Sequence, residues 1–138
     1  MQQRQTILTV RTRGVGLYEL TDEIEAWLRE SGIAQGLLTL FCRHTSAGLL
    51  ITENASPAVH RDMLRWLGRA VPEGDHYEHS LEGPDDMPAH IKAMMTGNSL
   101  TVPIAAGGTT LGTWQGVYLA EHRLRPHERT VVAHVMGD

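Results

Sequence analysis

The C-terminal part of the chain is patterned like β-strands throughout, and this feature most narrows the folds open to the sequence. Residues 99–104 alternate apolar side chains with others, as expected of a strand that is buried on one face. Gly107 and Gly108 predict a hairpin turn, and two further strands are predicted over residues 113–122 and 129–136. Consecutive strands joined by short turns favour antiparallel pairing over a parallel, doubly wound sheet.

The part of the chain before these strands combines further strands with amphipathic helical patterns. Strands are predicted over residues 6–11, 37–44 and 49–52. The predicted helices run from Thr21, as N-cap, to Gly32; from Ser56, with Pro57 at the first helical position, to Gly68; and from about Met87 to Met95. The side chains expected to form the buried stripe of the second helix are Val59, Met63, Trp66 and Leu67.

Strands outnumber helices in this pattern, and the helices come early. We therefore predict an α+β fold, with a β-sandwich-like core of mainly antiparallel strands and two to three helices packed on it. A chain of 138 residues can bury about two-thirds of its unfolded surface in one core. One domain over residues 1–138 is expected, without a linker.

Charge and hydropathy exclude several classes of partner. The chain has 16 acidic and 12 basic residues and no run of Lys or Arg, so nucleic acid is not an expected partner. The longest nearly apolar stretch, residues 36–42, is far below the roughly 20 residues that cross a bilayer, so no membrane association is expected. The first residues lack the pattern of a secretory signal and Cys42 is the single cysteine, which favours the cytoplasm.

Three of the eight histidines, His44, His79 and His90, stand beside other polar residues at predicted element ends or in the long loop before residue 88. Converging imidazoles favour metal binding or proton transfer, although this spacing matches no compact zinc motif. Asp86 precedes His90 by one helical turn, which places the two on one face. On spacing alone, a capping aspartate beside a surface histidine is the favoured interpretation of the pair, because helix starts are rich in aspartate.

Other polar residues stand where strands end. Thr45 and Ser46 follow a predicted strand, and hydroxyl and backbone N–H groups at such a turn can hold an oxyanion or simply stabilise the turn. Trp114 and Gln115 are adjacent, so one of them could line a pocket while the other faces away. Glu121 is either part of a solvated edge or a carboxylate that faces the same pocket.

Taken together, several segments resemble the YjbQ family. The resemblance covers nearly the whole chain, in order. It rests on the segments 42–47 (CRHTSA), 52–55 (TENA), His79 with 83–90 (GPDDMPAH), and 111–116 (LGTWQG) with 121–123 (EHR).

The resemblance implies an α+β homotrimer with secondary thiamine-phosphate synthase activity. This reaction joins a pyrimidine diphosphate to a thiazole phosphate and releases pyrophosphate, with help from a divalent ion, zinc or magnesium. The implied metal ligands are His44, His79 and His90, which with Asp86 and Glu121 form the implied catalytic set. The implied ligand-binding residues are Thr45, Ser46, Glu53, Asn54, Trp114 and Gln115.

Two positions depart from the family pattern. Ser56 stands where many members have Asp, and Asp86 stands where others have Asn, which favours Asp86 as a ligand or orienting group over a charged base. An alternative from another class is a non-catalytic, trimeric protein that binds a metal or a small phosphorylated metabolite. A hydrolase of small phosphate esters would use the same residues.

Overall fold

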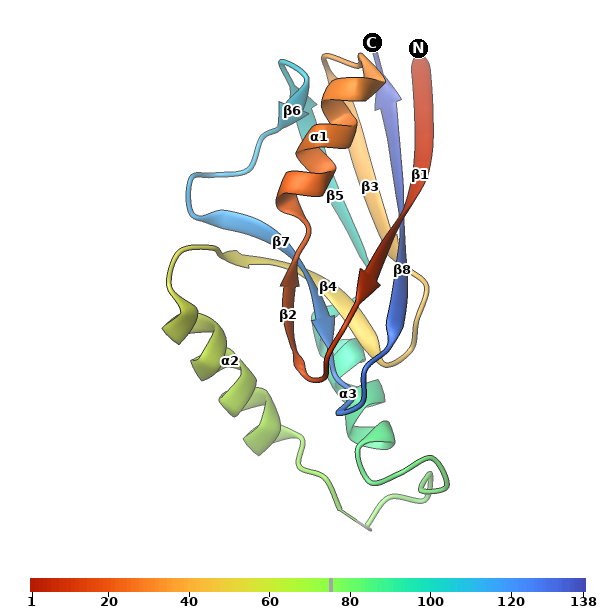
Figure 1. Ribbon diagram of the computed structural model, residues 1–138, viewed down its shortest axis with the longest axis vertical. Coiled ribbons are helices and arrows are strands. Elements are labelled where there is room, and N and C mark those ends of the chain that lie inside the picture. Colours follow the sequence, from red (N-terminus) through yellow and green to blue (C-terminus); the bar gives the residue numbers. More distant parts are fainter. Residues whose placement is uncertain (75) are drawn as a thin grey trace.

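The computed structural model describes residues 1–74 and 76–138 of the chain. Within them the chain forms three helices and eight strands in two antiparallel sheets, so the predicted α+β class is confirmed (Figure 1). One sheet has the strand order β1-β8-β3-β5-β6 and the other the order β2-β7-β4. The elements are β1 (Gln2–Arg11), β2 (Gly16–Glu19), α1 (Thr21–Ser31), β3 (Gly36–Cys42), β4 (Ala47–Glu53), α2 (Pro57–Ala70), α3 (Asp86–Thr96), β5 (Ser99–Ala105), β6 (Gly108–Thr109), β7 (Gln115–Glu121) and β8 (Glu128–Gly137).

The core lies on the inner face of the five-stranded sheet, against α1 and the smaller sheet. Leu38, Leu40 and Cys42 alternate along β3 and are buried, as their spacing predicts. Leu38 is paired with Val102 of β5 and Val135 of β8, which are buried as well. Full burial of one such aliphatic side chain is worth about 1.5–3 kcal/mol, so this row is a main source of stability.

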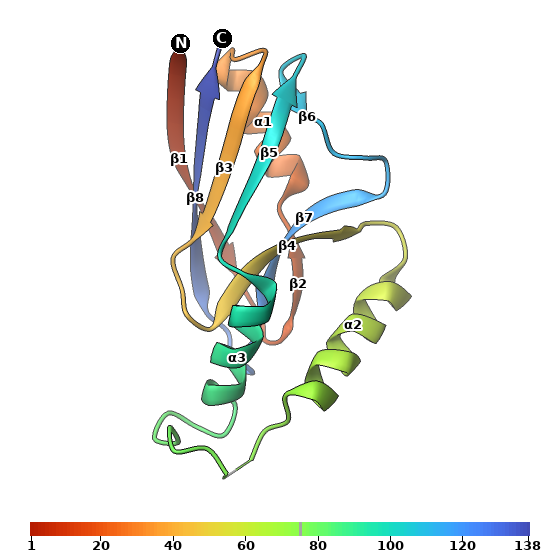
Figure 2. The same cartoon turned by 180° about the vertical axis from the view of Figure 1, so that it is seen from behind.

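Helix α1 covers part of this core, while the opposite face of the five-stranded sheet is left open (Figure 2). Ile24 and Leu28 of α1 are fully buried. The prediction that Thr21 caps this helix was wrong: the N-cap is Leu20, and the Thr21 hydroxyl accepts the backbone N–H of Val117 at 2.9 Å. That bond ties the start of α1 to β7.

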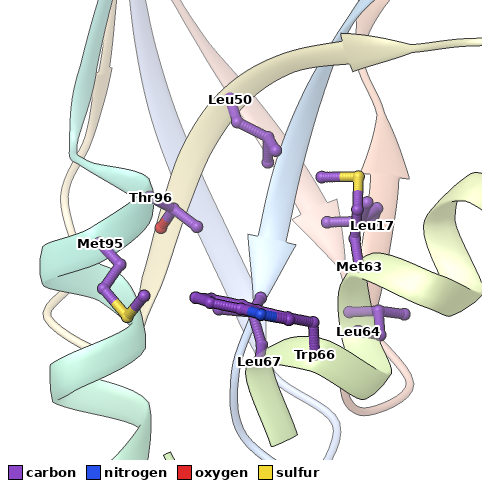
Figure 3. A pocket seen from close by; sticks show the side chains of 8 residues that line it. All are labelled: Leu17, Leu50, Met63, Leu64, Trp66, Leu67, Met95 and Thr96. Atoms are coloured by element: carbon purple, nitrogen blue, oxygen red, sulfur yellow. The ribbon is translucent and has the colours of Figure 1, made fainter. Parts of the chain in front are cut away.

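Helix α2 differs from its predicted packing. It begins at Pro57 as expected, but it ends at Ala70 rather than at Gly68. None of its residues is fully buried, and Trp66 is 54% exposed, so the predicted buried stripe was wrong. The apolar side chains of α2 instead line an open groove of about 280 Å³ between α2, the smaller sheet and α3 (Figure 3). The amphipathic pattern is present, but the chain supplies no layer that closes over it.

Helix α3 packs on β4 and thereby places the polar residues of its first turns. Gly48 of β4 allows the contact, because a Cβ there would lie 2.1 Å from the Thr96 hydroxyl oxygen. The backbone N–H of Leu49 donates to the Gly97 carbonyl at 3.0 Å and fixes the end of the helix against the strand. Among the described residues, no helix is long and apolar enough to cross a membrane.

Candidate metal site

The polar residues at the start of α3 meet a histidine from the loop before it. Asp86 Oδ2 lies 2.7 Å from His79 Nε2 and 3.0 Å from His90 Nε2. One ligand atom from each of the three residues can be chosen so that all lie within 4.8 Å of one another. We call these three residues the triad. Asp86 and His90 share one face of α3, as their spacing predicts.

The hydrogen bonds of His90 show which of its two ring nitrogens carries the proton. Its Nδ1 lies 2.8 Å from the carbonyl oxygen of Thr45. A carbonyl only accepts, so Nδ1 carries a proton, and Nε2 of the neutral ring presents a lone pair to the carboxylate of Asp86. A lone pair that faces a carboxylate oxygen requires a cation or a second proton between them. A histidine held by a backbone carbonyl is also the usual arrangement of a metal ligand.

The other carboxylate oxygen of Asp86, Oδ1, is hydrogen-bonded to Arg123. Arg123 Nη1 donates to Asp86 Oδ1 at 2.6 Å, and Arg123 Nε donates to Asp85 Oδ2 at 3.0 Å. Although burial raises the pKa of Asp86, hydrogen bonds to His79 and Glu82 and the charge of Arg123 hold it below its usual value. Asp86 is therefore an oriented carboxylate with one oxygen directed at two imidazoles.

His44 does not join this group, although the sequence predicted it as a third histidine ligand. Its Nε2 accepts the backbone N–H of Thr130 at 2.8 Å, so the lone pair of this nitrogen is not available to a metal ion. The ring lines a cleft of about 460 Å³ that His90 and Thr45 also line. The structure thus replaces the predicted three-histidine set with two histidines and a carboxylate and puts His44 beside them.

Glu121 is placed away from the triad, contrary to its predicted role as a catalytic or metal-binding carboxylate. It is fully buried, and its Oε1 accepts from Arg129 Nε at 2.8 Å and from the Thr12 hydroxyl at 2.7 Å. Burial raises the pKa of Glu121, but the bonds from Arg129 and Thr12 outweigh this effect and lower it. Its oxygens are occupied by fixed donors, so Glu121 is a structural partner of Arg129.

The hydroxyl residues of the turn after β3 have separate roles. Ser46 is buried and its Oγ accepts from Arg129 Nη2 at 2.9 Å, which does not fit the predicted contact with phosphate. Thr45 is exposed at the cleft, and its carbonyl oxygen holds His90. Arg129 thus anchors the turn that orients a triad histidine.

The remaining predicted ligand-binding residues gather at the far end of β4. Asn54 Nδ2 donates to the carbonyl oxygens of Thr113 and Gln115, both at 3.2 Å. Glu53 accepts the backbone N–H groups of the two residues just before α2, and Gln115 Oε1 accepts the Gly112 N–H at 2.8 Å. Trp114 is 65% exposed. The structure does not bring these residues to the triad, and their bonds are internal to the loops there.

Sequence reasoning missed three residues that shape the site. Arg123, Asp85 and Arg129 were not among the predicted site residues, yet they fix Asp86 and the turn at Thr45. The available signals were the adjacent acidic pair at positions 85 and 86 and the place of Asp85 and Arg123 in segments that carry the family resemblance. The basic partner of the acidic pair is 38 residues from Asp85 in the chain, so only folding shows the match.

The chain is therefore an α+β protein with two sheets and a site made of two histidines and one carboxylate. The family model described as UPF0047 protein YjbQ-like matches residues 6–138, and the chain belongs to this family.

The relatives agree with this assignment over nearly full length. A UPF0047 protein of Synechocystis is 49% identical over 99% of this chain and 94% of its own. UPF0047 protein YjbQ of Escherichia coli O157:H7 is 43% identical over 97% of this chain and 98% of its own. A YjbQ/UPF0047 family structure from Clostridium acetobutylicum superposes with a TM-score of 0.89, at 36% identity, over 95% of this chain and 99% of that one.

Proposed function

We propose that the protein is a metal-dependent enzyme that acts on a small phosphorylated molecule, with the ion held by the triad. The observation that carries this proposal is the convergence of His79 Nε2 and His90 Nε2 on one oxygen of Asp86, at 2.7 and 3.0 Å. Two imidazoles and a carboxylate suit zinc, whereas magnesium prefers oxygen ligands alone. Zinc is therefore the ion favoured by the donor set.

The chain's own residues prepare this site. The Thr45 carbonyl fixes the tautomer of His90, and Arg123 turns Asp86 so that one oxygen faces both rings. The side chain of Asp86 is only 3% exposed, while that of His79 is 44% exposed, so the site opens on the His79 side. A bound divalent ion would supply positive charge to polarise a phosphate oxygen and stabilise a departing phosphate group.

The reaction we propose is the one that the family resemblance implies, thiamine-phosphate synthesis. The bond from the pyrimidine's methylene carbon to its diphosphate breaks, a bond from that carbon to the thiazole nitrogen forms, and pyrophosphate leaves. The role proposed for the triad is to hold the charge of the leaving diphosphate. Thr45, exposed at the adjoining cleft, is the hydroxyl we assign to a phosphate oxygen.

The experiment that tests the proposal is metal analysis of untagged protein, followed by assay with the two phosphorylated precursors. We expect about one zinc ion per chain in the wild type, and loss of this ion in the His79→Ala, His90→Ala double variant. His134→Ala is the matched control, because His134 lies on β8 and contacts Gln5 instead of the triad. Thiamine phosphate should form only with the metal-loaded wild type and the control. Metal-free wild type after addition of divalent ions would refute the proposal.

One observation favours the second candidate, a binding protein without turnover. A diphosphate site commonly uses several free cationic side chains, but Arg123 is engaged by Asp85 and Asp86. Under this alternative, zinc and a phosphorylated metabolite would raise the melting temperature while no product forms. The same preparations therefore separate the two candidates.

We also propose that the protein forms the homotrimer that the resemblance implies. Ile7 and Phe41 flank Val132 on the open face of the five-stranded sheet, and they are 52% and 46% exposed. Such a row is costly to leave in water and suits contact with a second copy. Light scattering coupled to gel filtration tests this, and a monomer at micromolar concentration would contradict it.

A further inference from the structure

His44 lies beside the triad but has the opposite hydrogen-bonding character to His90. The backbone N–H of Thr130 can only donate, and it lies 2.8 Å from His44 Nε2. Nε2 is therefore the acceptor nitrogen, and the ring proton is on Nδ1. In His90 the proton is also on Nδ1, but it is donated to the Thr45 carbonyl, and the lone pair of Nε2 faces Asp86. In His44 the lone pair of Nε2 is hydrogen-bonded to the Thr130 N–H, and the N–H of Nδ1 is available to a ligand.

The surroundings of His44 keep its ring neutral. Burial lowers the pKa of His44, and the positive charges of Arg129, Arg43 and His127 lower it further, while Glu121 acts in the opposite direction. The ring thus remains a neutral donor near pH 7. Because Arg129 also holds the next turn of the chain through Ser46, the position of the ring is set by buried structure.

The two rings line the same cleft, together with Thr45 and Asn98. His90 offers a lone pair to a cation, and His44 offers an N–H to an acceptor. A ligand that satisfies both must carry one oxygen for the ion and another for a neutral donor. A phosphate group has such oxygens on one centre. Among the described residues, we find no partner for His44 Nδ1, which leaves this N–H available.

We propose that His44 is a positioning residue that donates its Nδ1 hydrogen to a phosphate oxygen of the ligand, while the ion on the triad holds another oxygen of the same phosphate. This inference rests on the proposed function and deepens it, because it names the phosphate as the group recognised and gives His44 a role other than metal ligand. His44 neither coordinates the ion nor removes a proton. It sets the orientation of the phosphate in the cleft.

The first test reads the tautomers of the histidines by long-range proton–nitrogen NMR of the labelled, metal-free protein at pH 7. We expect His44 to show a protonated Nδ1 and an unprotonated Nε2. On addition of zinc, the Nε2 signals of His79 and His90 should shift, and that of His44 should not. A proton on His44 Nε2, or a zinc-induced shift of that nitrogen, would overturn the proposal. Because the tautomer is read without metal, this outcome is independent of whether the triad binds an ion.

The second test measures the affinity of the cobalt-loaded protein for inorganic phosphate through its visible absorption. His44→Gln can still accept the Thr130 N–H through its amide oxygen, but its amide N–H groups lie at the same end of the side chain and not at the position of Nδ1. We expect roughly tenfold weaker phosphate binding with unchanged cobalt affinity. His134→Gln is the matched control and should bind phosphate like the wild type. Unchanged phosphate affinity in His44→Gln would overturn the role of His44 while leaving the metal site intact. Failure of cobalt to bind in the wild type would instead refute the proposed function.

Discussion

Two carboxylates in this protein are each held by an arginine, yet they have different surroundings. Glu121 is fully buried, and fixed donors from Arg129, Thr12 and the Arg123 backbone occupy its oxygens. Asp86 has Arg123 on one oxygen, while its other oxygen faces His79 and His90. Around Glu121 all neighbours are committed donors. Around Asp86 two neighbours can either donate or bind a cation.

The difference indicates that Glu121 forms an ion pair that stabilises the fold, whereas Asp86 can bind a ligand in addition to its partners in the chain. Every oxygen of Glu121 is satisfied within the chain, so a ligand would have to break existing bonds. Among the described residues, the neighbours of the Oδ2 atom of Asp86 are the two imidazoles, and these can bind a cation together with it. Burial and an arginine partner therefore do not distinguish a binding carboxylate from a structural one. The distinction comes from the other neighbours, which are fixed donors around Glu121 and imidazoles around Asp86.

The largest effect expected from this comparison is loss of stability on removing the charge of Glu121. Glu121→Gln leaves Arg129 as an uncompensated buried charge, which costs about 3–5 kcal/mol of unfolding free energy. Glu128→Gln, at an exposed position on β8, should change it by less than about 0.5 kcal/mol. Urea denaturation followed by circular dichroism measures both. Equal effects of the two substitutions would contradict the structural role assigned to Glu121.

The sequence predicted the fold where local pattern decides the outcome. The alternation in β3 and β5 was enough to identify Leu38, Leu40, Val102 and Ile104 as inward-facing, because period two admits one buried face. For amphipathic helices, the sequence pattern does not determine the packing partner. Helix α1 fully buries Ile24 and Leu28, whereas α2, which is also amphipathic, fully buries none of its side chains. An apolar stripe on a helix does not specify which other element covers it.

The site was predictable only in part, for a related reason. Asp86 and His90 are four residues apart on one helix, so their proximity follows from sequence. His79 was a candidate from its place among polar residues in the long loop, and the family resemblance supported it. The role proposed for His44 depends on Thr130, which lies 86 residues further along the chain. No local pattern could show that this amide would occupy its Nε2.

A second, somewhat smaller effect concerns acid stability beside Glu121. Burial, with the nearby charge of Lys92, lowers the pKa of His122 to about 4. A histidine whose pKa is lowered on folding is kept neutral in the native state. The unfolded chain therefore binds more protons between about pH 6.5 and pH 4, and the native state is progressively destabilised as the pH falls through this range, by about 3 kcal/mol in total.

The variant His122→Gln isolates this contribution. It cannot titrate, so its unfolding free energy should fall less between pH 7 and pH 4 than that of the wild type, by about 3 kcal/mol. The acidic groups Asp85, Asp86 and Glu121, whose pKa values are also lowered, act in both proteins and cancel in the difference. Parallel pH profiles for the two proteins would show that the buried imidazole is not held neutral.

The smallest expected effect is on the proposed metal site and concerns Arg123. Arg123→Met removes the donors that orient Asp86 but leaves every triad ligand in place, so zinc affinity should fall by roughly 10- to 100-fold, as for other residues that hold a ligand from behind. Arg125→Met, at an exposed position two residues away, is the matched control and should leave the affinity unchanged. Competition with a chromogenic chelator measures the zinc affinity, and a circular dichroism spectrum checks that both variants are folded. A folded Arg123→Met protein that binds zinc like the wild type would mean that the first turn of α3 alone orients Asp86. The contrast with Glu121 would then lie in the histidines and not in how each carboxylate is held.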